Sequence, residues 1–313
     1  MSRLYDRTLR SNSICTDRRA KNELKDMLSN IPVIVADNVT EYYFAHNTQE
    51  TWNLNNDFPT IMPPFNMCFI ETRPPSKIVS EKFGILDWPS ENPLNWGILM
   101  IAEPALERHF CSFNIPKEKD VVPTDAKWIV AFYYIAEREK NRPKVAKLCS
   151  TIYLDNHGKY INDSIRHIVS ENFKKMMGEE EVARAGNEMQ GCLLFPVLLT
   201  VSFMHCKNVT MQSIEPPIKL SKKHQKKYGK PLVRYHVLEI EPMKKILRTE
   251  GRIEEIGLNK ALHICRGHFK DYREGGGLFG KHKGLYWWDS HVRGNADKGV
   301  VLKDYQVNAG EGL

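Results

Sequence analysis

Short apolar segments rich in β-branched and aromatic residues constrain the fold of this chain more than any other feature. Three of them stand in its first half, at 96–102 (WGILMIA), 127–135 (KWIVAFYYI) and 147–154 (KLCSTIYL), and their composition is typical of buried β-strands. Such segments outnumber the helical ones and lie too close together for the helices of parallel βαβ units. The sequence therefore predicts an α+β fold, with a largely antiparallel, twisted sheet and a few helices.

Periodicity and chain breakers place the other elements. Helical spacing of apolar residues predicts a helix at 18–28 and the longest helix at 162–190. Residues 219–230 follow two prolines and are rich in lysine, which predicts a solvated linker or loop. The DNHG sequence at 155–158 predicts a hairpin turn. Further strands are expected at 33–36, 41–45, 67–71, 192–205, 233–240, 261–272, 285–293 and 300–307.

The positive charge of the chain is concentrated towards its C-terminus. The formal net charge is +7 at pH 7, whereas 17 Lys or Arg against 8 Asp or Glu between Glu215 and Lys283 leave an excess of 9 there and about −2 elsewhere. A local surplus favours a polyanionic partner, such as nucleic acid, over a generally basic surface. The change in composition predicts an α+β domain at 1–214 and a basic, strand-rich region at 215–313, either separate or continuous with the first domain.

The seven cysteines are odd in number, scattered and without a CxxC pair. This pattern argues against a disulfide framework or a zinc ribbon and for a reducing compartment. No apolar core of signal-peptide length stands at the N-terminus, and the longest apolar run, at 192–203, is too short to span a bilayer. We therefore expect a cytoplasmic protein without a membrane partner, and no motif predicts a cofactor.

The stretch IKLSKKHQKKYGK carries six lysines and no acidic residue. Lysines at this density repel one another unless phosphate neutralises them, and Tyr228 with His224 could stack on a base or a sugar. The alternative is a solvated loop that keeps the protein soluble. Two further lysines belong to the glycine-rich EGGGLFGKHK, which lacks the Ser/Thr ending of a P-loop and is expected to form a hairpin loop or mobile lid. The candidate nucleic-acid-binding residues are Lys222, Lys223, Lys226, Lys227, Tyr228, Lys230, Lys281 and Lys283.

Histidine and arginine recur in two predicted strands near the C-terminus. Alternation puts Arg266 and His268 on one face of the first strand, and His291 and Arg293 on one face of the second. If these strands pair, the four side chains converge on one patch. Two histidines suffice for general acid–base cleavage of RNA, and arginine stabilises the charge that builds on phosphorus. The sequence thus predicts a metal-independent ribonuclease with His268, His291, Arg266 and Arg293 in the catalytic roles.

Two other interpretations of these residues stay open. In the first, both histidines are interior and bond to backbone groups, while the two arginines pair with Asp271 and Asp289. In the second, histidine and cysteine hold zinc, but alternation separates His263 from His268 and no spacing matches a zinc module, so no metal site is predicted. The nitrogen and sulfur ligands on offer are His263, Cys265, His268, His291, His205 and Cys206.

The stretches SFMHCKNVT at 202–210 and KLSKKHQKKYGKPLVRYHVLEIEP at 219–242, together with HICRGHF and HVRG, resemble a family of phage- and prophage-encoded proteins without an assigned activity. The resemblance covers roughly residues 202–313. It implies a mobile-element origin, the cytoplasm of the host cell, and a role in phage–host conflict or phage DNA metabolism. It transfers no catalytic residue.

The leading hypothesis is therefore a nucleic-acid-directed, phage-type protein that acts as a metal-independent ribonuclease. A rival from another class is a non-catalytic module that binds nucleic acid, a host protein or a phage protein during phage–host conflict. A third is a DNA base-directed enzyme such as a glycosylase, in which Trp or Tyr stacks on an extruded base. The sequence does not choose between RNA and DNA.

Overall fold

The computed structural model divides the chain into two compact units. The first unit comprises Met1–His205 and Val209–Glu239, and the second comprises Cys206–Asn208 and Ile240–Leu313. The basic segment 215–239 thus belongs to the first unit, whereas composition places a boundary after residue 214. The structure describes residues 3–12, 14, 18–46, 54–74, 95–106, 122–139, 142–161, 165–169, 174–176, 178–241, 261–265, 267–278, 280–288, 291–293 and 295–300.

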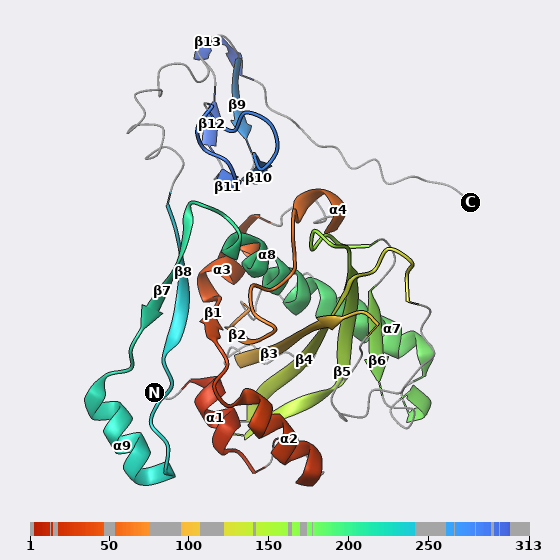
Figure 1. Ribbon diagram of the computed structural model, residues 1–313, viewed down its shortest axis with the longest axis vertical. Coiled ribbons are helices and arrows are strands. Elements are labelled where there is room, and N and C mark those ends of the chain that lie inside the picture. Colours follow the sequence, from red (N-terminus) through yellow and green to blue (C-terminus); the bar gives the residue numbers. More distant parts are fainter. Residues whose placement is uncertain are drawn as a thin grey trace. The chain divides into compact units, whose positions relative to one another are not determined.

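An eight-stranded sheet forms the centre of the first unit, in the order β6-β5-β4-β3-β2-β1-β8-β7 (Figure 1). Neighbours from β2 to β6 pair antiparallel, while β1 runs parallel to both β2 and β8. The expected α+β class with a mostly antiparallel sheet is therefore confirmed, although the sheet is mixed. Its strands are β1 (Val33–Val35), β2 (Met67–Thr72), β3 (Asn95–Pro104), β4 (Trp128–Glu139), β5 (Arg142–Leu154), β6 (Arg166–Val169), β7 (Val209–Ile214) and β8 (Tyr235–Ile240).

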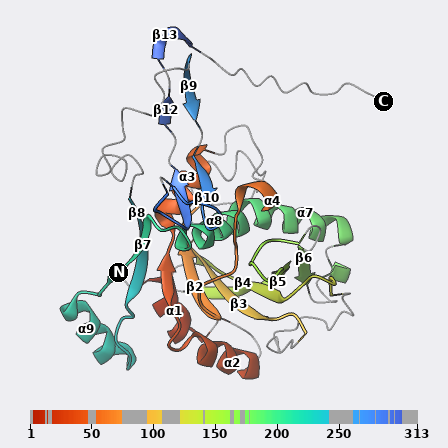
Figure 2. The same ribbon diagram turned by 45° about the horizontal axis from the view of Figure 1, so that its top comes forward.

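One face of this sheet is covered by the two N-terminal helices, α1 (Leu4–Arg10) and α2 (Arg18–Leu28) (Figures 1 and 2). The helix expected at 18–28 is thus confirmed. Tyr5 of α1 and Leu28 of α2 are buried in one apolar cluster with Phe69 of the sheet. Removal of this apolar surface from water is what holds the two helices on the sheet.

The opposite face of the sheet is covered by α3 (Asp37–His46), α7 (Glu179–Met189) and α8 (Phe195–Met204) (Figure 2). The rings of Tyr42 in α3 and Phe203 in α8 meet edge to face, with their centroids 6.4 Å apart. The first unit is therefore a three-layer arrangement, with the sheet between two layers of helices.

The strand expected at 41–45 is wrong, because these residues belong to helix α3. Aromatic residues in EYYFA favour a strand locally. The buried positions, however, are Val39, Thr40, Tyr43 and Phe44, which recur at helical spacing. With α4 (Leu54–Asp57), this helix connects the parallel strands β1 and β2. β1, α3, α4 and β2 thus form a βαβ unit, although the sequence predicted strands too close together for such units.

The strand expected at 192–205 is also wrong. A π-helical turn, η1 (Gln190–Leu194), continues α7 directly into α8. Every residue from Phe195 to Phe203 is buried, so the segment has no polar face, and an apolar run alone does not distinguish a buried helix from a buried strand. Pro196, which lacks the N–H for a regular helical bond, stands directly after this π-helical turn, where the i→i−4 pattern is already interrupted. Among the described helices, none is long and apolar enough to cross a membrane.

The long helix expected at 162–190 is replaced by two elements. Residues Arg166–Val169 form β6, which pairs antiparallel with β5, and the helix α7 begins only at Glu179. Apolar residues at 165, 168, 169 and 173 fit a helical face in the sequence, but hydrogen bonding to the edge of the sheet decides the structure of this segment.

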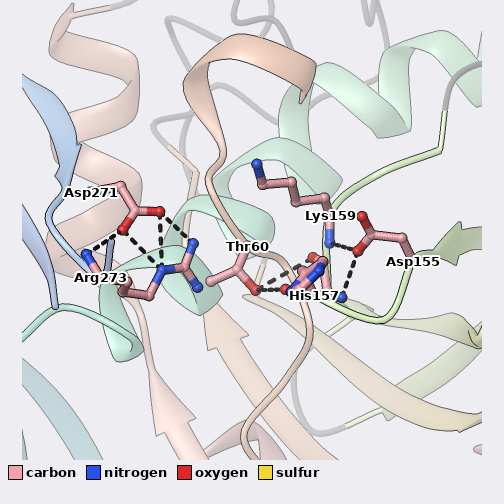
Figure 3. A network of polar contacts seen from close by, with 7 residues as sticks. Thr60, Asp155, His157, Lys159, Asp271 and Arg273 are labelled. Carbon is pink, nitrogen blue, oxygen red and sulfur yellow. Dashed lines mark hydrogen bonds and ion pairs between the residues drawn. The ribbon is translucent and has the colours of Figure 1, made fainter. Parts of the chain in front are cut away.

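The turn expected at 155–158 is present and follows β5. Gly158 has a φ of +74°, which an L residue adopts only with strain. The Asp155 Oδ1 accepts the backbone N–H groups of His157 and Lys159 at 2.8 and 2.9 Å (Figure 3). Aspartate in this position replaces the backbone partners that a turn leaves unpaired.

The second unit contains two small sheets. β10 (His268–Asp271) and β11 (Leu285–Trp288) form an antiparallel pair. The strands expected at 261–272 and 285–293 are confirmed, each as two consecutive strands, whereas the strand expected at 300–307 lies outside the described residues beyond residue 300. In the other sheet, β9 (Ala261–Cys265) lies between the antiparallel β12 (His291–Arg293) and the parallel β13 (Asn295–Val300).

Asn208 fixes the backbone of the second unit at β11. Its side-chain Oδ1 accepts the N–H of Trp287, and its Nδ2 donates to the Trp287 carbonyl, both at 2.9 Å. The same Nδ2 donates to the Glu241 carbonyl. The Asn208 amide thus makes the two hydrogen bonds that a neighbouring strand would otherwise make to Trp287. Because Asn208 is buried, the backbone groups of Trp287 are satisfied without water.

Candidate nucleic-acid interface

The lysine-rich segment of the first unit is a helix, α9 (Ile218–Tyr228), and the expected linker or loop is wrong. Pro217 precedes the first residue, and Gly229 ends the helix in the left-handed region with a φ of +77°. Lysine is itself a good helix former. Proline at the start and glycine just past the end are the sequence signal that would have identified this helix.

Five lysines form one exposed face of α9. They recur at the spacing i, i+3, i+4, i+7 and i+8, which places them on one side of a helix that turns about 100° per residue. No residue of α9 is buried, and the helix contains no acidic residue. We call this side the lysine face, and its members are Lys219, Lys222, Lys223, Lys226 and Lys227.

The opposite side of α9 is bonded to the segment that follows the helix. The Ser221 hydroxyl accepts the backbone N–H of Leu232 at 3.1 Å. One ring nitrogen of His224, Nδ1, lies 2.7 Å from the carbonyl oxygen of Lys230. These bonds orient the helix, so that the lysine face points away from the chain that continues towards β8.

Helix α1 holds the same side of α9 through Arg10. Its Nη1 lies 2.9 Å from Nε2 of His224, and its guanidinium carbon lies 4.2 Å from the centre of the Tyr228 ring. Arginine can only donate, so Nε2 of His224 accepts from Arg10, and Nδ1 faces the Lys230 carbonyl. His224 thus links α1 to the end of α9.

The ring of Tyr228 is engaged within the protein. Besides the Arg10 guanidinium, the ring of His224 and the ammonium group of Lys227 contact it. The centre of the His224 ring lies 4.8 Å, and the Nζ atom of Lys227 lies 5.1 Å, from the centre of the Tyr228 ring. The sequence suggested that Tyr228 and His224 stack on a base or a sugar. In the structure both rings are used to attach α9 to α1, although Tyr228 remains 42% exposed.

Helix α1 also binds the segment between α9 and β8. The Asp6 Oδ1 accepts the backbone N–H of Val233 at 3.1 Å, and the Arg3 guanidinium lies 3.5 Å from the centre of the Tyr235 ring. Burial raises the pKa of Asp6, and the hydrogen bonds from Val233 and Arg3 counteract this rise. The outer side of α1 thus binds both α9 and the residues that lead from α9 into β8.

The inner side of α1 is bound to two carboxylates of the sheet. Nε of Arg7 donates to Oε1 of Glu137 at 2.7 Å, in a two-fold contact that is almost fully buried. Oε1 of Glu71 accepts the backbone N–H of Tyr5 at 2.6 Å. Burial raises the pKa of Glu71 to about 7, against the lowering effects of the Tyr5 N–H and the neighbouring arginines. The position of α1, and with it that of α9, therefore depends on buried charged groups.

Further basic residues continue the positive surface from α9 onto α2. Partial burial lowers the pKa of Lys25, and the nearby positive charges of Lys21 and Lys230 lower it further. The charge of Lys230, which follows α9, thus acts on Lys25 of α2, so the positive field of the segment that contains the lysine face extends to α2.

Lys281 and Lys283 lie in the loop that joins β10 to β11 in the second unit. Both are exposed, and the loop closes through the N–H of Leu278, which donates to the His282 carbonyl at 2.8 Å. Beside this loop, Arg273 makes a two-fold contact with Asp271, so Asp271 has its own arginine within the same unit (Figure 3). The loop presents its two lysines from a hairpin, as expected, and not from a P-loop.

The two candidate catalytic histidines belong to different strand pairs. His268 is exposed and stands opposite Trp288 in the β10–β11 pair, whereas His291 stands opposite Cys265 in the β9–β12 pair. The two predicted strands therefore pair, as the ribonuclease hypothesis requires. His268 and His291 stand in different strand pairs, however, so the pairing gives no support to an acid–base pair.

The arginines of that hypothesis add no support either. Arg293 stands opposite His263 in the β9–β12 pair, and Arg266 lies outside the described residues. Within the described part of the chain, no group of three His, Cys, Asp or Glu residues is arranged to hold a metal ion. Of the ligands considered, His205 is bonded through Nε2 to the Met62 carbonyl, and the Cys206 thiol is buried, which raises its pKa.

A chain of hydrogen-bonded polar side chains in the first unit includes His167. Tyr134 donates to the Ser150 hydroxyl, which lies 2.9 Å from Nδ1 of His167, its cross-strand partner. Burial lowers the pKa of His167, although a hydrogen bond to Gln190 in η1 raises it. Ser150 is fully buried and out of reach of a substrate, so this serine–histidine contact is structural. No motif in the sequence announces it.

Comparison of the chain with protein-family models, with curated proteins and with solved structures finds no match. The resemblance to phage- and prophage-encoded proteins therefore stays a prediction.

Proposed function

We propose that the protein is a nucleic-acid-binding module that uses the lysine face of α9. The observation that supports this is the one-sided arrangement of the helix: five lysines face water on one side, while Ser221, His224 and Tyr228 attach the other side to the protein. A loop that served only solubility would need no such orientation. Lysines held in place lose less freedom when they bind phosphate than lysines on a flexible loop do.

Each lysine that neutralises a phosphate releases a condensed counterion, and this release drives binding at low salt. The five lysines of α9 extend over about 12 Å along the helix, because each residue rises about 1.5 Å. Lys230, Lys25 and Lys21 lengthen the positive surface at one end. The result is a surface suited to several consecutive phosphates.

A membrane surface fits α9 less well than nucleic acid does. An interfacial helix needs one continuous apolar face opposite its basic face. The exposed apolar or aromatic residues of α9 are Ile218 (72% exposed), Leu220 (46%) and Tyr228 (42%). Ile218 and Leu220 lie about 160° apart around the helix axis, and the polar Ser221, His224 and Gln225 lie between them on the side of Tyr228. These residues therefore form no continuous apolar face.

Catalysis is not part of this proposal. His268 and His291 belong to different strand pairs of the second unit, as described above. Base-directed chemistry needs an aromatic ring that can stack on an extruded base. Trp287 and Trp288 are both buried in the second unit, and so is Trp96 in the first, while Tyr228 has Arg10 over one side of its ring. The proposal therefore rests on the lysine face, whose chemistry supports binding.

The proposal is tested by fluorescence anisotropy with labelled nucleic acids over a range of salt concentrations. A lysine-face variant, in which Lys222, Lys223, Lys226 and Lys227 become Gln, is compared with a variant of equal charge change at exposed lysines elsewhere. We expect the lysine-face variant to bind roughly tenfold or more weakly and its salt slope to fall by up to about 4, since each lost lysine–phosphate contact lowers it by about 1. The control variant carries Gln at Lys127, Lys144, Lys159 and Lys175.

Equal losses in both variants would show that net charge, and not α9, drives binding, and would overturn the proposal. Incubation of the unlabelled protein with the same probes in excess EDTA, followed by a denaturing gel, separates binding from cleavage. We expect intact strands. Cleavage of RNA that is lost in His268→Ala would restore the ribonuclease hypothesis. An acidic protein partner would instead be indicated if no nucleic acid bound at any salt concentration.

A further inference from the structure

We infer that the ligand of the lysine face is a nucleic-acid duplex, DNA or RNA, held by its phosphates without selection of base sequence. This inference rests on the proposed function and specifies its ligand. Three features of the interface carry it: the engaged aromatic rings, the absence of planar base-reading side chains from the lysine face, and the breadth of that face.

The first feature separates a duplex from a single strand. Proteins that bind single strands without sequence preference stack the bases on aromatic side chains. Around α9, the Tyr228 ring is occupied by Arg10, and the Tyr235 ring lies beneath the guanidinium of Arg3, 3.5 Å from its centre. Tyr5 of α1 is buried. Each of these described rings is thus buried or has a guanidinium over one side, which reduces the aromatic surface available for stacking beside the lysines.

The second feature concerns base recognition. Base edges are read in the major groove chiefly by arginine or lysine at guanine and by asparagine or glutamine at adenine. The lysine face has none of the planar side chains in this set, and lysine acts towards phosphate as a point charge. Gln225 falls on the opposite half of the helix, between Ser221 and Ile218 when the residues are projected down the axis. Contacts to phosphate position a protein but carry no sequence information.

The third feature is the breadth of the lysine face. At about 100° per residue the five lysines spread over an arc of roughly 140° around the helix axis, with Lys222 at one border and Lys227 at the other. A helix of about 10 to 12 Å diameter fits the major groove of B-DNA, which has a similar width, and duplex RNA offers a wide, shallow minor groove. A single strand offers one line of phosphates to such a helix, whereas a duplex groove offers a line on each side. Ammonium groups spread over a broad arc match the second arrangement.

The experiment measures the affinity of the full-length protein for five labelled probes of equal length. These are a DNA duplex, a second DNA duplex of the same composition in scrambled order, an RNA duplex, and a DNA and an RNA single strand that do not fold. We expect at least one type of duplex to bind about tenfold or more tightly than its own single strand, and the two DNA duplexes to agree within about threefold.

The lysine-face variant should lose this preference for duplex, while the variant at Lys127, Lys144, Lys159 and Lys175 should keep it. Equal or tighter binding of single strands would overturn the inference and leave the proposed function standing. A difference of more than about tenfold between the two DNA duplexes would also overturn it, because only base readout or sequence-dependent shape produces such a difference. Failure of every probe to bind would overturn the proposed function itself.

Discussion

Arg10 and His224 connect α1 to α9 through a single contact, with 2.9 Å between Nη1 and Nε2. The two residues lie near opposite ends of the first unit's sequence, and no motif in the sequence links them. The contact fixes the tautomer of the imidazole and covers one side of the Tyr228 ring with the guanidinium. The direction in which the lysines point is therefore set by a residue that belongs to the N-terminal helix.

Arg10→Lys should loosen α9 without changing the net charge. Lysine keeps the positive charge but loses the planar guanidinium that both stacks on Tyr228 and donates to His224. We expect faster hydrogen exchange of the α9 amides and affinity for nucleic acid reduced by a few fold, from a local loss on the order of 1 to 2 kcal/mol. Arg184→Lys, at an exposed ion pair with Glu181 in α7, is the matched control and should change neither quantity. Unchanged exchange in α9 after Arg10→Lys would contradict the role given to Arg10.

Glu71→Gln should flatten the dependence of stability on pH. Burial raises the pKa of Glu71 from 4.5 to about 7, so the folded state binds this proton more tightly than the unfolded chain does. The stabilisation is fully present below pH 4.5 and is lost as the pH rises towards about 7. Glutamine keeps an acceptor for the Tyr5 N–H but does not titrate.

The measurement for Glu71 is the free energy of unfolding in urea, for wild type and Glu71→Gln, at several pH values across that window. Between the lower and upper limits the wild type should lose on the order of 1 to 3 kcal/mol relative to the variant. Subtraction of the two curves removes the contribution of every other titrating group. Parallel curves would show that Glu71 ionises as freely in the folded protein as in the unfolded chain.

Gly186→Ala should destabilise the first unit even though alanine favours helices. A Cβ at this position of α7 would lie 2.5 Å from Cδ2 of His167, whose ring is held by Ser150 and Gln190. We expect a loss of about 1 to 3 kcal/mol in thermal or urea unfolding, as for other overpacked sites. The control is Gly276→Ala, where an added Cβ meets no atom within 4 Å. A gain in stability at residue 186 would mean that His167 moves aside at little cost.

Asn208→Ala should destabilise the second unit. It leaves the N–H and carbonyl of Trp287 without their side-chain partner, and each buried backbone group left unpaired costs about 1 to 3 kcal/mol. Because Trp287 and Trp288 are buried, tryptophan fluorescence should shift to longer wavelength at lower urea concentrations than in the wild type. Asn156→Ala, at an exposed position of the turn after β5, serves as the control. Coincident unfolding curves for both variants and the wild type would refute the role of Asn208.

The central strands could be predicted from the sequence, because β3 and β4 combine β-branched and aromatic residues throughout. The helices α3 and α8 could not. Tyr42 and Phe44 favour a strand locally. Their helical structure depends on packing of α3 in the helix layer, where Tyr42 contacts Phe203 of α8. In α8 all sides are apolar because all sides are buried, so periodicity carries no information there.

The charge of the candidate site could be predicted as well, but its orientation could not. Six lysines without an acid are evident in the sequence, whereas the partner that orients them, Arg10, is separated from them by most of the first unit. For the histidines, alternation predicts which residues share a face within one strand, but not how two strands are aligned. That register depends on the length of the hairpin loop between β10 and β11, which the pattern of residues does not determine.

The pairing of β1 with β8, which comes much later in the sequence, has a consequence for synthesis of the protein on the ribosome. Ile34 of β1 pairs with Ile70 of β2 on one side and with His236 of β8 on the other. During translation β2 follows soon after β1, but β8 emerges only after most of the first unit has left the ribosome. Until then one edge of β1 has no strand to pair with, and exposed edges promote association between chains. Completion of this sheet therefore waits for the same stretch of chain that delivers the lysine helix.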